Sequence, residues 1–257
     1  MDLRDWSAAV VNRLGEPANC QVFEEEGMLL AAFPPQRLVI HFVSLFTKDT
    51  PAKLLSVQAR YAQSGHFLIH LWEDVWKARP EQVLSRVRSL LGLDRKIYAR
   101  QTHASVLDSR ATSAFLDDHH LQGAVRAKYR YALFKDDMPV AVATFGPLRQ
   151  MESRGVQHIS TELIRFAGLS GFRITGGLSK LLQHAITELG VQDVMSYADR
   201  DWSLGKGYET LGFKLAGETP PLYFELRNGE RVRKNNETAD CTAKPFNTGS
   251  LKYILDV

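Results

Sequence analysis

The chain is poor in cysteine, lacks any long hydrophobic run and has no large excess of charge of either sign. Its two cysteines, Cys20 and Cys241, have no metal-binding spacing, so neither a zinc site nor a disulfide framework is expected. No stretch reaches the ~18 consecutive apolar residues that a membrane span needs. The first residues also lack the basic-then-apolar order of a secretory signal. We therefore expect a cytoplasmic protein without a membrane partner.

The charge balance excludes little else. The 257 residues include 32 basic and 29 acidic side chains, which gives a net charge of +3. This balance would tolerate nucleic acid or an anionic cofactor but requires neither. With 44% hydrophobic and 24% charged residues, the composition is that of a globular protein long enough for one large domain or two smaller ones.

The first part of the chain has the pattern of a small α/β module, residues 1–95. Pro34 and Pro35 mark a turn between two apolar segments, which predicts a hairpin. Gly65 and Gly92 end two segments of helical periodicity, and a polar turn at residues 94–96 marks the boundary. The expected strands are 28–33, 37–46 and 66–72, and the expected helices are 53–64 and 80–91.

Residues 96–257 have the pattern of a second, larger α/β domain. Gly176 and Gly177 open a helix with one apolar face, and Gly190 ends it. A turn at residues 136–139 separates two strands. The expected strands are 129–135, 140–145, 159–166, 191–198, 222–227 and 251–255, the expected helices are 108–119 and 178–189, and a polar loop is expected at 231–240.

Residues 196–215 carry the most informative pattern. A strand ends at Asp199, an acidic loop follows, and a helix that contains Tyr208 ends at Gly212, a residue suited to a left-handed C-cap. A phenol can donate a hydrogen bond to a departing thiolate, and a carboxylate can take a proton from an attacking amine. This pattern therefore indicates an acyl-group transferase. The alternatives are a tyrosine that packs on the sheet and an aspartate that caps the turn.

The turn from Arg173 to Lys180 joins a strand to a helix N-terminus. Gly176 and Gly177 let the backbone approach a ligand closely, and the helix amides then meet an anion together with the positive end of the helix dipole. Arg173, Ser179 and Lys180 would add charge or hydrogen bonds. The alternative is a helix start that needs only a flexible entry.

Together these segments resemble the Gcn5-related N-acetyltransferase (GNAT) superfamily. Arg173-Ile-Thr-Gly176-Gly177-Leu178 matches the first and fourth positions of the superfamily's pyrophosphate-binding turn and departs from it at the sixth. Tyr208-Glu-Thr-Leu-Gly-Phe matches the late helix, whose tyrosine often protonates the coenzyme A thiolate. The resemblance implies a mixed, mostly antiparallel split sheet flanked by helices, with acetyl-CoA or another acyl-CoA as the cofactor.

The resemblance is closer to the Mom-like branch, DNA-modifying acyltransferases of phages and mobile elements. The matching motifs are His120-Leu-Gln-Gly123, Thr144-Phe-Gly146, Glu162-Leu-Ile-Arg-Phe166, Gly176-Gly-Leu-Ser-Lys180, Ser196-Tyr-Ala-Asp-Arg200 and Asn247-Thr-Gly-Ser-Leu-Lys-Tyr253. This branch implies a nucleobase amine in DNA as the acceptor. The basic residues that would contact phosphates are Arg126, Lys128, Arg130, Arg149, Arg154, Arg231, Arg233 and Lys234, with a solvated face as the alternative for most of them.

The site that the residues and the resemblance predict has two parts. The catalytic residues are Tyr208, Asp199 and His120. The pair His119-His120 could serve as a base near neutral pH but also suits a helix end. The cofactor-binding residues are Arg165, Phe166, Arg173, Thr175, Gly176, Gly177, Ser179 and Lys180. No metal is expected.

The first module resembles the very-short-patch-repair-type nuclease that precedes this transferase in some phage proteins. The matching segments are 29–45, 65–76, 80–91 and 96–100. That nuclease holds magnesium with carboxylates on adjacent strands, whereas Leu30 and His41 occupy the corresponding positions here. We therefore expect a degenerate module, in which Glu73 and Asp74 form an exposed acidic turn.

The sequence thus predicts an acyl-CoA-dependent N-acyltransferase that acts on an amine, with a nucleobase in DNA as the acceptor that the Mom-like motifs imply. Two alternatives stay open. One is a catalytically inactive protein that binds DNA or a partner, and the other is a metal-dependent nuclease that uses Glu73 and Asp74.

Overall fold

The computed structural model describes residues 2–15, 20–155, 157–233 and 245–257, and the chain forms two compact units. The first unit comprises Met1–Gly92, Ala198–Leu204 and Glu218–Leu251, and the second comprises Leu93–Tyr197, Gly205–Gly217 and Lys252–Val257. Cys241, Lys234 and the rest of the predicted loop at 234–240 lie outside the described residues. Among the described helices, none combines the length and the apolar character needed to cross a membrane.

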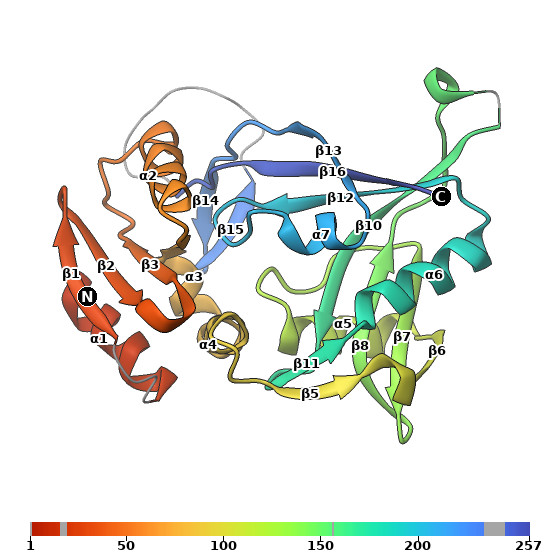
Figure 1. Cartoon of the computed structure of the whole chain (residues 1–257), viewed down its shortest axis with the longest axis horizontal. Coiled ribbons are helices and arrows are strands. Elements are labelled where there is room, and N and C mark those ends of the chain that lie inside the picture. Colours follow the sequence, from red (N-terminus) through yellow and green to blue (C-terminus); the bar gives the residue numbers. More distant parts are fainter. Residues whose placement is uncertain (1, 16–19, 156, 234–244) are drawn as a thin grey trace. The chain divides into compact units, whose positions relative to one another are not determined.

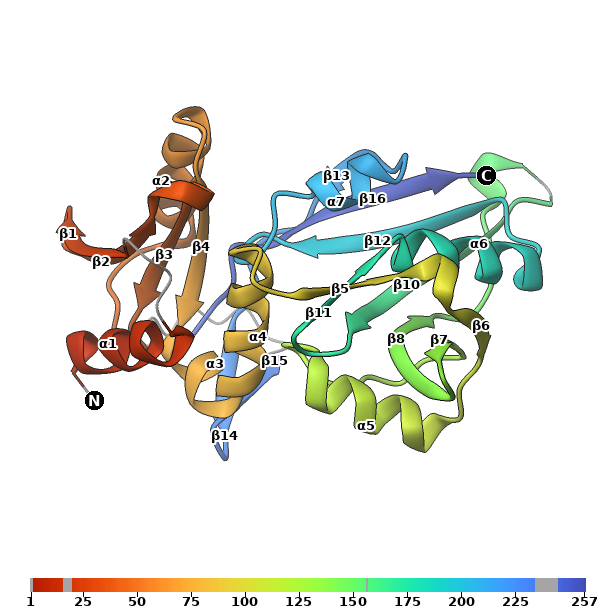
Figure 2. The ribbon, with the colours of Figure 1, turned by 60° about the horizontal axis from the view of Figure 1, so that its bottom comes forward.

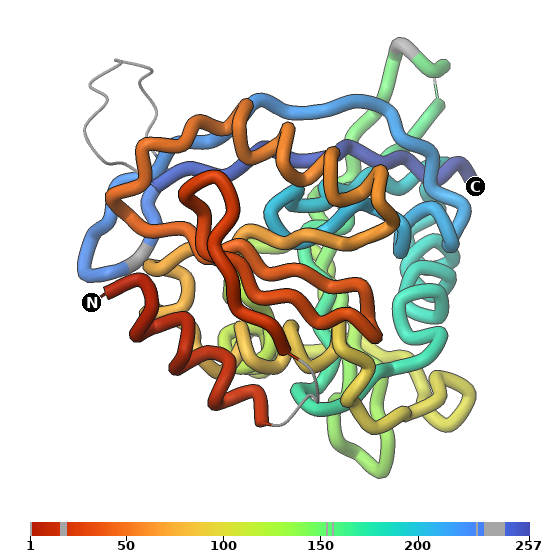
Figure 3. The backbone as a smooth tube through the Cα atoms, turned by 60° about the vertical axis from the view of Figure 1, so that its left-hand side comes forward, coloured from red at the N-terminus to blue at the C-terminus, as the bar shows by residue number. Residues whose placement is uncertain are grey.

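The first unit is built on a four-stranded sheet in the order β1-β2-β3-β4 (Figure 3). Its strands are β1 (Gln21–Glu25), β2 (Met28–Phe33), β3 (Leu38–Val43) and β4 (Phe67–Trp72). β2 and β3 pair antiparallel through the 3-10 helix η1 (Pro34–Gln36), so the predicted hairpin is confirmed. β3 and β4 pair parallel, because α2 (Pro51–Gln63) carries the chain back between them.

Both faces of this sheet are covered, which explains its continuous apolar strands. α1 (Leu3–Leu14) places Trp6 against Phe42 on one face, with ring centroids 5.0 Å apart. α2 packs Val57 in one cluster with Leu68 on the other face. α3 (Glu73–Ala78) follows β4 directly, and α4 (Pro80–Leu90) begins with Pro80 in its first turn, as predicted.

Trp72, at the end of β4, gathers later segments of the chain into the first unit. Its ring lies 4.7 Å from that of Phe246, the guanidinium of Arg231 lies 5.2 Å from its centre, and its indole N–H donates to Asp201 Oδ2 at 3.1 Å. These contacts group residues 198–204 and 218–251 with the N-terminal residues. The predicted division into 1–95 and 96–257 used a single boundary, so it did not place these later segments with the N-terminal residues.

A hairpin in the first unit occupies the start of the predicted polar loop. β14 (Phe224–Arg227) and β15 (Glu230–Arg233) pair antiparallel around Asn228 and Gly229, whose φ angles are +53° and +83°. The prediction of a loop was wrong for residues 231–233. An Asn-Gly turn of this kind returns the chain along the preceding strand, and the polar composition did not indicate that pairing.

The second sheet has the order β13-β16-β12-β10-β8-β7-β6, with the short β9 also paired to β10 (Figure 1). β6, β7, β8 and β10 pair antiparallel in turn, whereas β10 and β12 pair parallel. The predicted mixed, mostly antiparallel sheet flanked by helices is therefore confirmed. Its strands are β6 (His103–Val106), β7 (Tyr129–Lys135), β8 (Met138–Phe145), β9 (Arg149–Gln150), β10 (Ile159–Gly168), β12 (Asp193–Asp199), β13 (Lys214–Glu218) and β16 (Ser250–Asp256).

In the second unit, α5 (Ser109–His119) and α6 (Gly177–Leu189) cover opposite faces of this sheet (Figure 2). On one face, Leu116 of α5 packs in a cluster with Val142 and Ala167. On the other face, the ring of His184 in α6 lies 4.9 Å from that of Tyr131. A further helix, α7 (Lys206–Thr210), follows β12 along the chain.

A separate pair of parallel strands precedes α6. β5 (Arg95–Tyr98) pairs with β11 (Phe172–Thr175), with Ile97 opposite Ile174. Arg173, Ile174 and Thr175 were instead predicted to belong to the turn from Arg173 to Lys180. The pairing was missed because β11 is short and its partner lies more than 70 residues earlier. Two 3-10 turns, η2 (Ala99–Gln101) and η3 (Glu152–Arg154), complete the elements of this unit.

β10 and β12 are paired only over their first residues. The register begins at Ser160 and Asp193 and ends at Leu163 and Ser196. A bulge that follows Leu163 bends β10, which continues alongside β8 to the end of the strand. The two parallel strands therefore part after Leu163 and Ser196.

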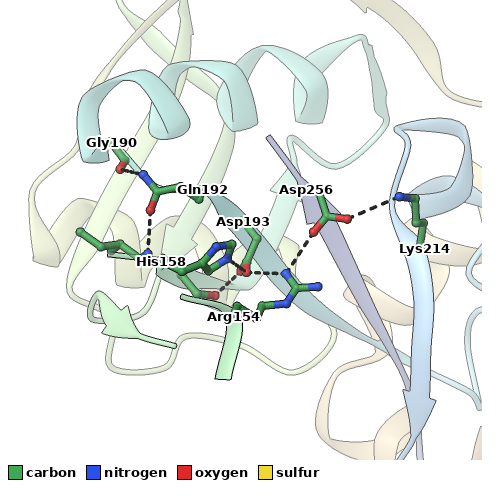
Figure 4. Close-up of polar contacts among 9 residues, drawn as sticks. Arg154, His158, Gly190, Gln192, Asp193, Lys214 and Asp256 are labelled. Atoms are coloured by element: carbon green, nitrogen blue, oxygen red, sulfur yellow. Dashed lines mark hydrogen bonds and ion pairs between the residues drawn. The ribbon is translucent and has the colours of Figure 1, made fainter. Parts of the chain in front are cut away.

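Asp193 links the starts of β10 and β12, the ends at which these two strands are paired (Figure 4). Its carboxylate, on a residue that is 2% exposed, lies 2.5 Å from His158 Nε2, accepts from Arg154 Nη1 at 2.8 Å and also accepts from the Ser160 hydroxyl. Burial alone would raise the pKa of Asp193, but the hydrogen bonds from Ser160, His158 and Arg154 outweigh it, and the pKa is lowered. The ionised carboxylate thus joins the starts of β10 and β12.

We expect Asp193→Asn to lower the free energy of unfolding by about 2 kcal/mol, because a buried amide cannot accept all three bonds. The control is Asp256→Asn, which removes the exposed partner of the same Arg154 and should cost much less than Asp193→Asn. Urea denaturation at pH 7 measures both, and equal losses would contradict this assignment.

The same comparison should depend on pH. Because the native pKa of Asp193 is lowered, its stabilisation is present above the unfolded pKa and is lost as the pH falls through the native value. The difference between the wild type and Asp193→Asn should therefore shrink below pH ~4.

Candidate functional site

Gly176 and Gly177 shape the N-terminus of α6. Gly176 is the N-cap residue, and its φ of +77° lies in the left-handed region that favours glycine. A Cβ on Gly177 would lie 2.7 Å from Ile174 Cγ2, so the backbone of α6 approaches β11 more closely than a side chain would permit. No side chain caps this helix among the described residues. Its first amides are therefore directed at solvent or a ligand, as in sites that bind phosphate.

Lys180 is engaged elsewhere. Its ammonium donates to the carbonyl oxygen of Ala99 at 2.9 Å and to that of Thr102, and these bonds tie α6 to the turn after β5. This differs from the expected contact with phosphate. The exposed residues around the turn include three other predicted cofactor contacts, Arg173, Thr175 and Ser179.

Arg165 and Phe166 lie on opposite faces of β10. Ala167 packs under α5, so Arg165, two residues before it, faces the same side. Phe166, between them, faces α6, and all the predicted turn residues belong to that side. Arg165 therefore projects away from the glycine turn, whereas Phe166 lies on the turn's side of the sheet, and the cofactor contacts of both stay predictions. Both side chains are half-buried.

Tyr208, on α7, contacts the residue at which β10 and β12 part. Its hydroxyl oxygen is 3.0 Å from Ser196 Oγ, and Ser196 Oγ is 3.0 Å from the carbonyl oxygen of Leu163. The carbonyl can only accept, so the single proton of Ser196 serves either Leu163 or Tyr208. When it serves Leu163, Tyr208 donates to Ser196. The phenol of Tyr208 is thus hydrogen-bonded to the backbone of β10 through one serine.

Ser196 begins one of the Mom-like motifs, but it was not among the predicted catalytic or cofactor-binding residues. Val194, Ser196 and Ala198 alternate along β12 and therefore share one face of the sheet, and all three are buried. A buried serine within an apolar alternation was the available signal. Its hydroxyl, and not a larger group, is what links Leu163 to Tyr208.

Aromatic packing holds Tyr208 in place. Its ring stacks on that of Tyr253, with centroids 5.4 Å apart, and meets Phe213 at 5.2 Å. Tyr253 is 1% exposed and donates to Glu209 Oε1 at 3.0 Å, and burial together with this bond raises its pKa to about 12. Gly205 makes the packing possible, because a Cβ there would overlap the hydroxyl of Tyr253.

Asp199 ends β12 and belongs to the first unit, whereas Tyr208 belongs to the second. Its carboxylate accepts the backbone N–H of Asp201 at 3.1 Å, the turn-capping arrangement stated as the alternative. Asp201, which the sequence did not single out, is the buried acid of this turn and accepts from the backbone and hydroxyl of Thr248. Burial, and then the charge of Asp199, raise the pKa of Asp201 to about 7.

His119 and His120 end α5. His119 Nδ1 lies 2.9 Å from Ser170 Oγ, and burial lowers the pKa of His119. His120 is the C-cap residue, and its Nδ1 accepts the N–H of Gln122 at 3.1 Å. These contacts fit the alternative in which the pair ends a helix, and each uses one ring nitrogen.

Glu73 and Asp74 are buried, so the prediction of an exposed acidic turn was wrong. They are 4% and 3% exposed, and α3 directs them toward cations. Asp74 forms two bonds with Arg231, at 2.6 and 3.0 Å, and Glu73 pairs with Lys77 at 2.6 Å. Within the described parts of the chain, no group of three His, Cys, Asp or Glu side chains is placed to hold a metal ion.

Comparison with known proteins finds similarity at the level of solved structures. No protein-family model matches the chain, and no curated protein matches its sequence. A Bacillus subtilis acetyltransferase in complex with CoA matches at 13% identity and a TM-score of 0.38, covering 61% of this chain and 99% of its own.

Two further matches have similar values. The ribosomal-protein-S18-alanine N-acetyltransferase from Escherichia coli matches at 16% identity and a TM-score of 0.40, covering 61% of this chain and 94% of its own. A GNAT family acetyltransferase from Elizabethkingia anophelis with acetyl-CoA bound matches at 12% identity and a TM-score of 0.38, covering 61% of this chain and 99% of its own. At these values the likeness carries no function over to this chain.

Proposed function

We propose that the chain is an acyl-coenzyme A-dependent N-acyltransferase. The proposal rests on one combination in the second unit: two parallel strands that part at Leu163 and Ser196, an uncapped glycine turn at the start of α6, and a phenol bonded to Ser196. Acyl-CoA carries a pyrophosphate, an extended chain and a thioester. These features require an anion site, strand edges whose pairing has ended, and an acid for the sulfur.

The glycine turn fits a pyrophosphate. The first amides of α6 and the helix dipole favour negative charge, and the absent Cβ of Gly176 leaves them open. The exposed Arg173 adds positive charge beside them, and Ser179 adds a hydroxyl. Phe166, on the α6 side of β10, offers apolar surface to the chain of the cofactor. Lys180 has no part in this contact, because its ammonium is bonded to backbone carbonyls.

Tyr208 is the proposed acid for the leaving sulfur. When bound, acyl-CoA supplies an acyl group activated as a thioester. As the nitrogen of the acceptor bonds to the carbonyl carbon and the C–S bond breaks, the electron pair stays on sulfur, whose thiol has a pKa of ~8.5. A proton from Tyr208 makes this departure easier, and Ser196 can then donate to the phenolate.

The amine must lose a proton as it reacts, and Asp199 and His120 remain the proposed residues for this role. A carboxylate can accept several hydrogen bonds, so the bond from the Asp201 amide does not exhaust Asp199. An imidazole is the side chain suited to accept a proton near neutral pH, which supports His120 for the same role. The Mom-like motifs support a nucleobase amine in DNA as the acceptor.

We expect acetyl-CoA to bind the full chain with a micromolar Kd in isothermal titration calorimetry. Gly176→Ala should weaken binding at least tenfold, because the new methyl group would add bulk at the start of α6, where the pyrophosphate is proposed to bind. Gly171→Ala is the matched control: its φ is also +77°, and a Cβ there meets no atom within 4 Å. It carries a similar backbone strain without facing the turn, so its Kd should stay near that of the wild type.

Two results would reject the binding site. Absence of binding by any acyl-CoA would favour the alternative of an inactive DNA- or partner-binding protein. An equal loss of affinity in both glycine variants would show that backbone strain, and not the turn, controls the affinity.

Tyr208→Phe should lower kcat by about 100-fold or more and leave the KM for acyl-CoA near its wild-type value, because only the proton donor is removed. Phenylalanine keeps the stack on Tyr253. Tyr223→Phe, at an exposed tyrosine of the first unit, is the control. Thiol release measured with an amine acceptor tests this, and an unchanged kcat would remove Tyr208 from the mechanism.

Mass spectrometry of host nucleosides after expression tests the acceptor. A nucleobase acceptor predicts a new nucleoside whose added mass equals an acyl group, absent when Tyr208→Phe is expressed. An unchanged nucleoside profile, together with acyl transfer to another amine, would retain the acyltransferase and exclude DNA.

A further inference from the structure

Three polar side chains form one row across the middle of the sheet in the second unit. Arg130 of β7 lies opposite Thr144 of β8, and Thr144 lies opposite Arg165 of β10. Opposite residues of antiparallel strands share a face, with Cβ atoms about 5 Å apart. The next row on the same face includes Val142 and Ala167, which pack against α5. The row of Arg130, Thr144 and Arg165 therefore continues the α5 face beyond its hydrophobic cluster.

The row contains buried polar atoms that the described residues leave without a partner. Thr144 is 0% exposed, yet its hydroxyl has no hydrogen-bond partner there, and neither has the buried Nε of Arg130. Burying such groups unsatisfied costs free energy, which an external acceptor and donor would recover. Arg130 is nevertheless held in position, because its Nη1 donates to the carbonyl of Ala127 at 2.8 Å.

A cavity of about 490 Å³ opens beside Arg130. Its wall combines guanidinium groups with hydroxyls from the first turns of α5. A wall of this kind suits an oxyanion, because both groups donate hydrogen bonds in several directions. The residues that supply these groups are Ser109, Ser113, Arg126 and Arg130, while the hydroxyl of Thr112, also in the wall, donates to the carbonyl oxygen of Asp108.

Three acids lie near this face. Asp108 already accepts backbone amides at the start of α5, and Asp117 accepts the amide of Ala124. Glu162 is an acid on the same face of β10, since its Cβ lies 3.6 Å from where a Cβ on Gly146 would be. Three carboxylates thus stand against the guanidinium groups of Arg126, Arg130 and Arg165, so the formal charges balance. The set of hydrogen-bond donors, and not a net charge, therefore favours an anion here.

We propose that the row of Arg130, Thr144 and Arg165 binds an oxyanion, a carboxylate or a phosphate, that belongs to the amine receiving the acyl group. This inference rests on the proposed function. Arginine offers up to five donors in a planar fork, of which Arg130 uses Nη1 for the carbonyl of Ala127 and Arg165 uses Nη1 for that of Ile164. Arg130 is the member of the row that lines the cavity, and the rest of its fork can donate to an anion there. The glycine turn lies on the α6 side, so the acceptor's anion does not compete with the pyrophosphate. Arg165 thus serves the acceptor.

The first test uses inorganic phosphate as the probe and the full chain, with the Kd taken from 31P NMR line widths. Saturating coenzyme A is present, so that the glycine turn is already occupied. We expect Arg130→Gln to weaken phosphate binding about tenfold, because a charge-assisted bond is lost. Thr144→Val should weaken it several-fold without loss of thermal stability, since the hydroxyl has no partner in the chain. Lys135→Gln, which removes a cation farther along β7, should have no effect.

The second test compares pairs of amines that differ by one anion: ethanolamine with phosphoethanolamine, glycinamide with glycine, and deoxyadenosine with its 5′-monophosphate, alongside a DNA oligonucleotide. We expect the anionic member of at least one pair to have a tenfold or greater advantage in kcat/KM, and Arg130→Gln to abolish it through KM. The preferred pair identifies carboxylate or phosphate, and activity on the oligonucleotide alone assigns the phosphate to DNA.

The outcomes separate this inference from the proposed function. Coenzyme A binding together with phosphate affinity that is the same in the wild type and Arg130→Gln would overturn the oxyanion site and leave the acyltransferase. Arg130-dependent phosphate binding in a chain that binds no acyl-CoA would reject the acyltransferase, and with it the acceptor role of this site. Equal kcat/KM for both members of every pair would also overturn the inference.

Discussion

The candidate site depends on how little of β10 pairs with β12. Parallel pairing is slightly weaker per residue than antiparallel pairing, and here it covers only four positions of each strand. The buried carboxylate of Asp193 compensates at one end by bonding Ser160, His158 and Arg154 across the two strands. At the other end the bulge after Leu163 turns β10 away. The ionic network holds the strands together at their starts, and the bulge separates them after Leu163. Together these two features determine where the strands part.

The alternation of β10 assigns its residues to two different faces. Phe166 faces α6 and the glycine turn, while Arg165 faces α5, Thr144 and Arg130. A single strand therefore separates the proposed cofactor side from the proposed acceptor side. The bulge contributes to this separation, because it changes which positions after Leu163 face each side. Two anions can then be bound on one sheet without occupying the same volume.

Local signals in the sequence predicted local structure well. The helix predicted to begin at Gly176-Gly177 and to end at Gly190 forms there and has the predicted apolar face. Contacts between distant residues were not predictable. Asp74 is buried because Arg231, more than 150 residues later, neutralises it, and Lys180 is engaged by carbonyls about 80 residues earlier. Composition and spacing carry no information on such pairings, which is why an acidic pair was taken for a surface turn.

Gly205 shows how a residue without a functional group can control one that has it. A side chain at this position would displace the hydroxyl of Tyr253, and Tyr253 carries the ring on which Tyr208 is stacked. The height of that stack determines where the phenol of Tyr208 meets Ser196. The position of the proposed proton donor therefore depends on the absence of a side chain at Gly205, two contacts away from the phenol.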